Sequence, residues 1–348
     1  MISDKMKTIY VVGAGGRTGM LFCRELQNAA RMIGVAFPAE IENIKSGKAK
    51  IARGKNPPEI FTAELVPPED FGAAIVRNAP DFLWLAARNP VDKITAFYYR
   101  HFTNQQNFPA LVLSQNGLSA VADAKKGLQE ALGQDADKVA IVRVSLINGV
   151  DLNTDGDGTL TIGYKLPIKL GFGTAQTYIG DTDVSFSPSL GLGKIFKKAG
   201  VKAREFRGKD VLAMENAKLF LNLIGMAAAA NGAGVAAGYR DKKIFKKEMA
   251  ALREFVSAAN AVRGGFAGKL GGYPVKLLAR LALLPVCLLA PWRGILAGAI
   301  AKGRNRPKDL SEIDYYNGEV VRLGKKANVP TPVNEEIIAK ARALKCKI

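Results

Sequence analysis

The stretch TIYVVGAGGRTGMLFCRELQNAA, residues 8–30, predicts a strand, a glycine turn and a helix in that order. Its first five residues are β-branched and aromatic, and those after the turn have helical periodicity. Gly13 would permit the tight turn, and Gly15 would let a pyrophosphate approach the backbone at the helix N-terminus. Thr18 stands where a third glycine is expected, and Gly19 comes one residue late. The stretch predicts a dinucleotide-binding loop, against the alternative of a glycine turn without a ligand. The candidate cofactor-binding residues here are Gly13, Gly15, Gly16, Arg17 and Thr18.

Further apolar runs with strand character follow, most of them ending in polar turns: MIGVAF (32–37), PDFLWLAARNP (80–90), PALVLSQNG (109–117) and VAIVRVSLINGV (139–150). They favour an open parallel sheet, in which the carboxyl ends of the strands line the ligand crevice. Arg88 and Asn116 fall at two such ends and are further candidates for cofactor binding. We therefore expect an α/β fold with an N-terminal Rossmann-type dinucleotide-binding domain, residues 1–208.

The residues after the second predicted strand bear on which dinucleotide binds. A carboxylate that binds the ribose is expected at the end of that strand, but the chain has FPA there. Glu40 and Glu42 come slightly later. A group of basic residues then follows: Lys45, Lys48, Lys50 and Arg53. These cations favour a 2′-phosphate and hence NADP (NADPH), with NAD and a merely solvated basic face as the alternatives.

The composition narrows the chemistry. The chain has 348 residues, and its net charge of +19 favours anionic partners. Its three cysteines are far apart, which gives no disulfide framework or zinc cluster and predicts a cytoplasmic location. Because His101 is the only histidine, proton transfer at neutral pH would depend on Lys, Asp, Glu or Tyr. We expect no metal site. No zinc finger, RNP motif or homeodomain helix accompanies the charge, so nucleic-acid binding is kept only as an alternative.

From about Gly208 the pattern changes to long helical segments, which predict a C-terminal all-helical domain over residues 209–348. The segments are 209–230, 242–262, 275–301, 309–327 and 333–345. The first contains MENAKLFLNLIGMAAAA, in which Lys218 and Asn222 share one helical face. An ionised lysine is costly to bury unless it is paired, and Glu215 lies one turn earlier. A polar stripe at the rim of a packed helix is the alternative to a functional pair.

The stretch SEIDYYNGEVVRLGKKANVPTPVNE, residues 311–335, resembles the closing signature of the ketopantoate reductase (2-dehydropantoate 2-reductase) family. That family typically has T-E-I-D-Y-x-N-G-x-V-V-R-L-G, then a basic or polar turn and V-P-T-P-x-N. The glycine loop, SQNG at 114–117 and the K-x-x-x-N pair at 218 and 222 follow the order of the family, so the resemblance covers nearly the whole chain.

The resemblance implies an N-terminal domain that holds NADPH and a helical domain that closes over it. It implies reduction of a small anionic 2-keto acid, most typically ketopantoate to pantoate in pantothenate biosynthesis. Lys218 would protonate the carbonyl oxygen as general acid, and Glu312 would hold the hydroxyl of the substrate. Asn116 would touch the cofactor and the active site, and Asn222 would help to orient the substrate.

The chain also departs from the family. Met226 stands where a second asparagine is common, and Ile300 stands where a serine usually grips the carboxylate of the substrate. Arg304, Arg306 or Lys308 could bind that carboxylate instead. A reductase of a different 2-keto acid is therefore an alternative, as is a regulator that binds NADP without catalysis.

Two stretches can each be interpreted in two ways. DLNTDGDG, residues 151–158, matches the first half of a calcium loop, but Ile162 replaces the bidentate glutamate, so a hairpin turn is expected. Residues 255–308 contain no Asp or Glu, and their longest uncharged run, LALLPVCLLAPW, is too short to span a membrane. We expect a helical core segment or a homodimer face there, and the alternative is an interfacial anchor on an anionic membrane with Trp292 at the headgroups.

Overall fold

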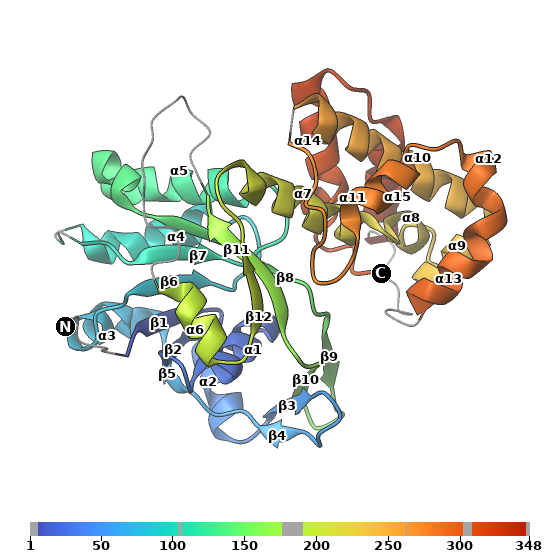
Figure 1. The fold of residues 1–348 in the computed structure, drawn as a ribbon. Helices are drawn as coiled ribbons and strands as arrows, with labels where there is room; N and C mark the ends of the chain where they lie inside the picture. Colours follow the sequence, from blue (N-terminus) through green and yellow to red (C-terminus); the bar gives the residue numbers. More distant parts are fainter. Residues whose placement is uncertain are drawn as a thin grey trace. The chain divides into compact units, whose positions relative to one another are not determined.

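A computed structural model describes residues 6–103, 105, 107–175, 191–262, 264–301 and 308–345 (Figure 1). The chain forms two compact units. The first comprises Met1–Gln115 and Ala120–Val211, and the second comprises Asn116–Ser119 and Leu212–Ile348. The first contains the β-sheets and the second is helical, so the predicted fold class is confirmed.

The first unit is built on an eight-stranded sheet with the order β12-β11-β8-β7-β6-β1-β2-β5. All neighbouring strands are parallel except β8 and β11. The strands are β1 (Thr8–Val12), β2 (Arg31–Val35), β5 (Glu64–Val66), β6 (Phe82–Leu85), β7 (Ala110–Leu113), β8 (Ile141–Leu146), β11 (Lys169–Thr174) and β12 (Lys202–Glu205). β1 lies between β2 and β6, so the chain order reverses at β1 and makes it the topological switch point of the parallel part of the sheet.

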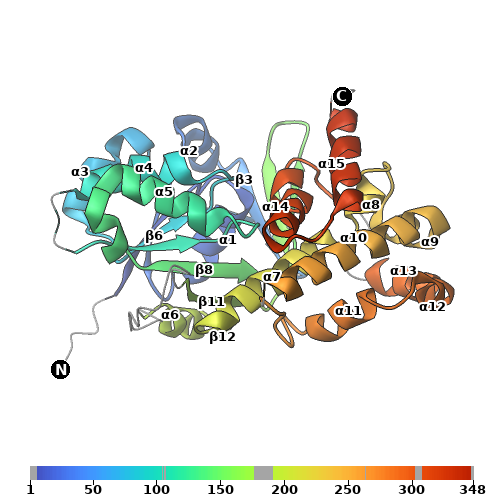
Figure 2. The same cartoon turned by 90° about the horizontal axis from the view of Figure 1, so that it is seen from above.

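Helices cover both faces of this sheet (Figure 2). On β1, Ile9 and Val11 point into one core cluster, and Tyr10 and Val12 point into the other, as the two-residue period of a strand requires. Three helices cover the face of Ile9: α1 (Arg17–Leu26), α2 (Pro38–Lys45) and α6 (Leu192–Lys198). The opposite face is covered by α3 (Phe71–Arg77), α4 (Asp92–Tyr99) and α5 (Ala120–Leu132). Short 3-10 turns connect these elements: η1 (Pro68–Asp70), η2 (Arg100–Phe102) and η3 (Gly133–Lys138).

A smaller sheet has the order β4-β3-β10-β9. Its strands are β3 (Ala49–Arg53), β4 (Glu59–Ile60), β9 (Val150–Thr154) and β10 (Leu160–Tyr164). β9 and β10 pair antiparallel around a turn in which the Asp155 N–H donates to the Thr159 carbonyl at 2.9 Å. The predicted hairpin at the calcium-like stretch is confirmed, and Ile162 is fully buried in the core.

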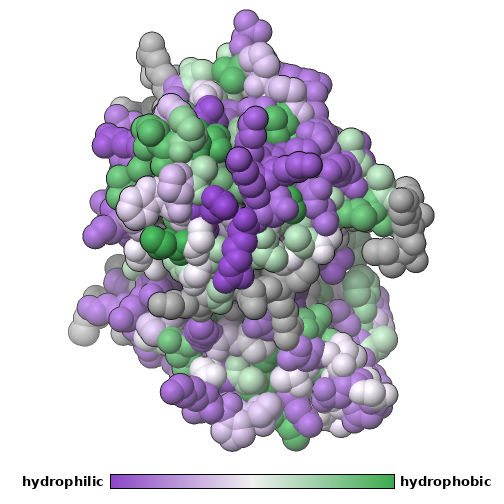
Figure 3. All heavy atoms as spheres, turned by 90° about the vertical axis from the view of Figure 1, so that its right-hand side faces the viewer, coloured by the Kyte–Doolittle hydropathy of each residue, from purple (hydrophilic) through white to green (hydrophobic). Residues whose placement is uncertain are grey.

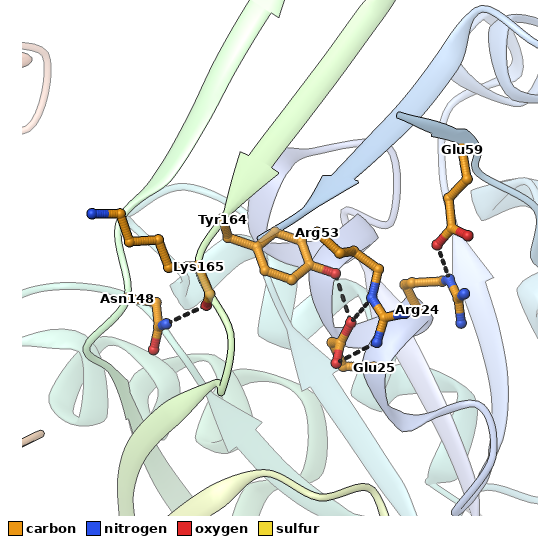
Figure 4. Close-up of polar contacts among 7 residues, drawn as sticks. All are labelled: Arg24, Glu25, Arg53, Glu59, Asn148, Tyr164 and Lys165. Atoms are coloured by element: carbon orange, nitrogen blue, oxygen red, sulfur yellow. Dashed lines mark hydrogen bonds and ion pairs between the residues drawn. The ribbon is translucent and has the colours of Figure 1, made fainter. Parts of the chain in front are cut away.

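Ion pairs join α1 to this smaller sheet (Figure 4). The carboxylate of Glu25 accepts Arg53 Nε at 2.6 Å and the hydroxyl of Tyr164 at 2.8 Å, and its side chain is only 6% exposed. One residue earlier, Arg24 Nε donates to Glu59 at 2.7 Å. Arg53 therefore already has a carboxylate partner, and its hydrogen bond to Glu25 raises the pKa of the guanidinium.

The second unit packs around α10 (Lys242–Ala261), its longest helix. The other helices are α7 (Lys209–Leu223, whose first residues belong to the first unit), α8 (Met226–Ala229), α9 (Val235–Arg240), α11 (Val275–Ala282), α12 (Val286–Leu289), α13 (Arg293–Ala301), α14 (Asn317–Ala327) and α15 (Pro332–Lys345). Two 3-10 turns, η4 (Ala290–Trp292) and η5 (Ile313–Tyr315), complete it. Residues from α8, α10, η5 and α15 form its hydrophobic cluster.

Three of the predicted helices are shorter than expected or divided. The segment 209–230 breaks before α8, where Gly225 adopts φ 92°, a conformation that favours glycine. The segment 275–301 is divided at Pro285 and Pro291, since proline lacks the N–H that continues a helix. The segment 309–327 becomes α-helical only at Asn317.

By length and composition, residues Lys209–Ala229 would suffice to cross a membrane, and 67% of their most apolar window is buried inside the protein. Burial to this extent is typical of a core helix.

Candidate functional site

The glycine loop follows β1 as the sequence predicts. Gly13 has φ 84°, and the N–H groups of Gly13 and Ala14 both donate to the carbonyl of Val35 at the end of β2, at 2.9 and 3.0 Å. The Gly16 N–H donates to the carbonyl of Gly13 at 3.0 Å and closes the turn. The loop is therefore held at the carboxyl ends of β1 and β2.

Helix α1 begins with its backbone N–H groups available to an anion. Its N-cap residue is Gly16, no side chain caps it, and its first turn contains no acidic residue. Arg17, the first helical residue, is exposed and adds a positive charge at the same end. The unsatisfied N–H groups and the helix dipole make this turn suited to a phosphate.

Gly19 has the packing role that the fingerprint assigns to its third glycine, although it comes one residue late. A Cβ atom built on Gly19 would collide with the carbonyl oxygen of Gly13 and lie 2.7 Å from Ala14 Cα. Only glycine lets α1 approach the loop this closely. The close approach of α1 to the loop therefore requires glycine at position 19, and Thr18 does not have to supply it.

A carboxylate lies against the loop. A Cβ atom on Gly15 would be 2.8 Å from Oε1 of Glu40, and Glu40 Oε2 accepts the Phe37 N–H at 2.9 Å. Of the four cations that favoured NADP, Lys45 and Lys48 are exposed and Arg53 is paired with Glu25. The charge known to lie beside Gly15 is thus negative.

Arg88 follows β6 and is exposed. The residues before it pack against the loop, because a Cβ on Gly13 would lie 3.2 Å from Ala87 N. Gln115 Nε2 donates to the carbonyls of Leu85 and Ala87 at 2.9 and 3.0 Å, and so fixes this turn. The structure brings the end of β6 to the glycine loop, as expected from the parallel sheet.

Sequence reasoning missed a buried arginine that supports the same edge. Arg143 of β8 is 3% exposed, and its Nη2 donates to the Gln115 carbonyl at 2.9 Å. A charged residue in the middle of the apolar run VAIVRVSL was the available signal, since buried charges are expected to have partners.

In the second unit, side chains from three distant segments form one hydrogen-bond network. Asn116 Nδ2 donates to Glu312 Oε2 at 3.1 Å and to the Tyr316 hydroxyl at 3.0 Å. Asn116 Oδ1 accepts Asn222 Nδ2 at 3.0 Å, and the Tyr316 hydroxyl donates to Glu312 Oε2 at 2.8 Å. Three predicted site residues are brought together here, and Tyr316 is a member that the sequence did not single out.

The segment that carries Asn116 is fixed by α14. Gly117 has φ 95°, and a Cβ there would lie 3.0 Å from Oε1 of Glu319 and 3.1 Å from the carbonyl of Tyr315. The Ser119 N–H donates to the same Oε1 at 2.9 Å, and Glu319 is only 4% exposed. Asn116 is thus positioned by backbone contacts as well as by its own side chain.

Lys218 lies in α7, one turn before Asn222, and is partly buried. Because side chains four residues apart lie on one helical face, Lys218 and Asn222 share a side of α7. Glu215, one turn earlier again, is 9% exposed. Lys218 therefore lies on α7 one turn from Asn222, which is itself a member of the Asn116 network.

Polar contacts with distant residues hold the end of α7. Lys308 Nζ donates to the carbonyls of Leu221, at 3.3 Å, and Asn222. Glu248 is 2% exposed and accepts the N–H groups of Gly225 and of Ala227, the latter at 3.0 Å. Burial raises the pKa of Glu248 to about 7, and the charge of Lys308 and the two N–H groups oppose this shift.

The residues at which the sequence departs from the family pattern, and the cations that could compensate, differ in their structural surroundings. Met226 is 1% exposed and belongs to the hydrophobic cluster, so no polar group replaces the second asparagine. Arg304 and Arg306 lie outside the described residues. Lys308 donates to the carbonyls at the end of α7.

The fold, the glycine loop and the Asn116 network together define a class of protein. Its members have a dinucleotide-type glycine loop on a parallel sheet and a helical unit that contains a polar network. Residues 306–345 match the family model described as the C-terminal part of ketopantoate reductase, PanE/ApbA. The matched residues include most of the stretch 311–335, so the resemblance of this stretch to the ketopantoate reductase family is confirmed. No curated protein sequence matches the chain.

Solved structures share the fold over the whole chain. A PanE/ApbA family ketopantoate reductase from Ralstonia eutropha JMP134 is 19% identical with TM-score 0.65, covering 98% of this chain and 99% of the other. A 2-dehydropantoate 2-reductase from Geobacter metallireducens GS-15 is 15% identical with TM-score 0.64, covering 97% and 99%. D-mandelate dehydrogenase with NADH and anilino(oxo)acetate is 15% identical with TM-score 0.67, covering 97% of each chain.

Proposed function

We propose that this protein is a nicotinamide-dependent reductase of a 2-keto acid, with Lys218 as general acid. The observation that carries the proposal is the network of Asn222, Asn116 and Glu312, one helical turn from Lys218. These are the residues that the family resemblance assigns to catalysis, and they come from segments far apart in the chain.

The chemistry follows from the charge that develops on the substrate. Hydride transfer to the keto carbon breaks the C–O π bond and leaves negative charge on the oxygen. The ammonium of Lys218 would stabilise this charge and donate the proton that completes the hydroxyl group. Asn222, one turn later on the same face, would orient the substrate by its amide.

Glu312 would hold a second polar group of the substrate. Within the described part of the chain, the hydrogen bonds to its carboxylate use Oε2, from Asn116 and Tyr316. Oε1 is then the oxygen that would accept a hydroxyl of the substrate. Ketopantoate carries such a hydroxyl, so it is the first substrate to test. Other 2-keto acids are the alternative, because Met226 replaces an asparagine that is common in the family.

For the cofactor, Gly13, Gly15, Gly16, Arg17 and Thr18 would hold the pyrophosphate, and a nicotinamide dinucleotide would supply the hydride. The placement of Glu40 beside Gly15 supports an unphosphorylated ribose, because a carboxylate accepts the ribose hydroxyl and repels a 2′-phosphate. We therefore propose NADH as the preferred cofactor, in place of the NADPH favoured by the basic residues alone. The structural neighbour D-mandelate dehydrogenase was solved with NADH.

The test is a spectrophotometric screen of 2-keto acids, ketopantoate included, with NADH and NADPH. We expect cofactor oxidation with at least one 2-keto acid and faster turnover with NADH. Dinucleotide binding without oxidation by any 2-keto acid would instead indicate a regulator on the same fold.

A further inference from the structure

Most large apolar side chains at the surface of the described residues belong to one segment. We name residues 273–295 the apolar segment; it contains α11, α12 and the start of α13. Eight of the fifteen large hydrophobic residues exposed in the described ranges lie in it: Tyr273, Leu277, Leu281, Leu283, Leu284, Leu288, Trp292 and Ile295. The expectation of a core segment is wrong for this face.

The exposed face is fixed by the rest of the unit. Val275, Ala279 and Ala282 bury the opposite face of α11. Arg253 of α10 donates to the carbonyls of Ala282, at 3.4 Å, and Leu284, and thereby holds the turn into α12. The apolar side chains are therefore presented by a packed scaffold.

The charged residues of the apolar segment itself are all basic. Residues 255–308 contain no Asp or Glu. On α11, Lys276 and Arg280 are exposed one residue before Leu277 and Leu281, so a cationic stripe runs beside an apolar stripe. Figure 3, which faces the side where α12 and α13 are drawn in Figure 1, shows apolar residues at the surface among hydrophilic ones.

We propose that the apolar segment is a docking surface for an anionic lipid bilayer. Leucine side chains would enter the acyl boundary, Trp292 (59% exposed) would lie at the headgroups, and Lys276 and Arg280 would contact lipid phosphates. The uncharged run between Arg280 and Arg293 is too short to span, so the attachment is peripheral.

The charge also argues against a second copy as the occupant. A two-fold interface brings the same patch onto itself. An interface that covered the whole segment would bury Lys276 and Arg280 of both copies, and the segment offers no carboxylate to pair with them. Anionic lipid supplies the missing negative charge, so the chemistry of the segment fits a membrane better than a homodimer.

The test is flotation of the full chain with vesicles of phosphatidylcholine alone and with added phosphatidylserine. We expect flotation with the anionic vesicles, weakened by salt. Lys276→Gln with Arg280→Gln should lower the partition constant about five-fold for each charge removed, and Leu277→Ser with Leu281→Ser should lower it about ten-fold or more. Val76→Ser is the matched control, because Val76 is 86% exposed on α3 outside the segment.

A probe on Cys287 distinguishes lipid contact from self-association. Cys287 is exposed within the segment, whereas Cys23 is buried and its thiol pKa is raised to about 12, which slows labelling. With Cys346→Ser, an environment-sensitive fluorophore on Cys287 should shift to the blue with anionic vesicles. Wild-type protein that does not float, or a dimer that Leu277→Ser with Leu281→Ser separates, would overturn the proposal.

Discussion

The side-chain amide of Asn222 donates a 3.0 Å hydrogen bond to the side-chain oxygen of Asn116, although 106 residues separate the two in the chain. The same Asn116 donates to Glu312, 196 residues further along. Asn116, Asn222 and Glu312, which come from three separate motifs of the sequence, therefore form one polar cluster. It also links the helix of Lys218 to the carboxylate proposed to hold the substrate.

Lys218→Ala should lower kcat by a factor of about 10² to 10⁴, because general acid catalysis typically contributes this much. The affinity for NADH should be unchanged, since the residues proposed to bind the pyrophosphate are in the glycine loop. Stopped-flow kinetics and titration of NADH fluorescence measure the two effects. Retained turnover in this variant would remove Lys218 from the mechanism.

Glu312→Ala should raise KM for a 2-keto acid that carries a hydroxyl, with less effect on one that lacks it. Tyr316→Phe should have the same selectivity but a smaller effect, about two- to ten-fold, because it removes one hydrogen bond that orients the carboxylate. Tyr273→Phe, at an exposed tyrosine, is the control. Equal losses on both substrates would contradict the role assigned to Glu312.

Glu40→Ala should shift the cofactor preference toward NADPH. It removes the carboxylate beside Gly15, so NADH loses a hydrogen-bond acceptor and the 2′-phosphate loses a repulsive neighbour. The ratio of kcat/KM for NADH to that for NADPH should fall by about ten-fold, as for the loss of one charged hydrogen bond. Glu42→Ala, on the exposed side of the same helix, should leave the ratio unchanged. Identical ratios in the wild type and Glu40→Ala would show that Glu40 does not select the cofactor.

Local patterns predicted most of the fold because their causes are local. The strand, glycine turn and helix over residues 8–30 depend on apolar periodicity and on the conformational freedom of Gly13. The break in the first helix of the second unit was missed, because Gly225 in a helical pattern does not reveal its φ of 92°. Its position is set by Glu248, which binds the N-terminus of the next helix from another part of the chain.

Charge partners were the least predictable feature of the site. Arg53 is one of the four cations that favour a 2′-phosphate in the sequence, yet Glu25 pairs with it, and the two are 28 residues apart. Tyr316 lies within the signature stretch 311–335, but its hydrogen bond to Glu312 depends on the turn before α14. Such pairs depend on tertiary packing, which neither periodicity nor spacing encodes.

Glu248 should make the stability of the protein depend on pH. Burial raises its pKa in the folded state from 4.5 to about 7, so between these values the folded protein binds more protons than the unfolded chain. The free energy of unfolding should therefore fall as the pH rises through this window, by about 3 kcal/mol, and then level off. Glu248→Gln lacks the titrating group but keeps an acceptor for the α8 backbone. Urea unfolding at about pH 5 and about pH 8 should show the wild type losing this stability relative to the variant. A difference between the two proteins that does not change with pH would mean that Glu248 has an ordinary pKa in the folded state.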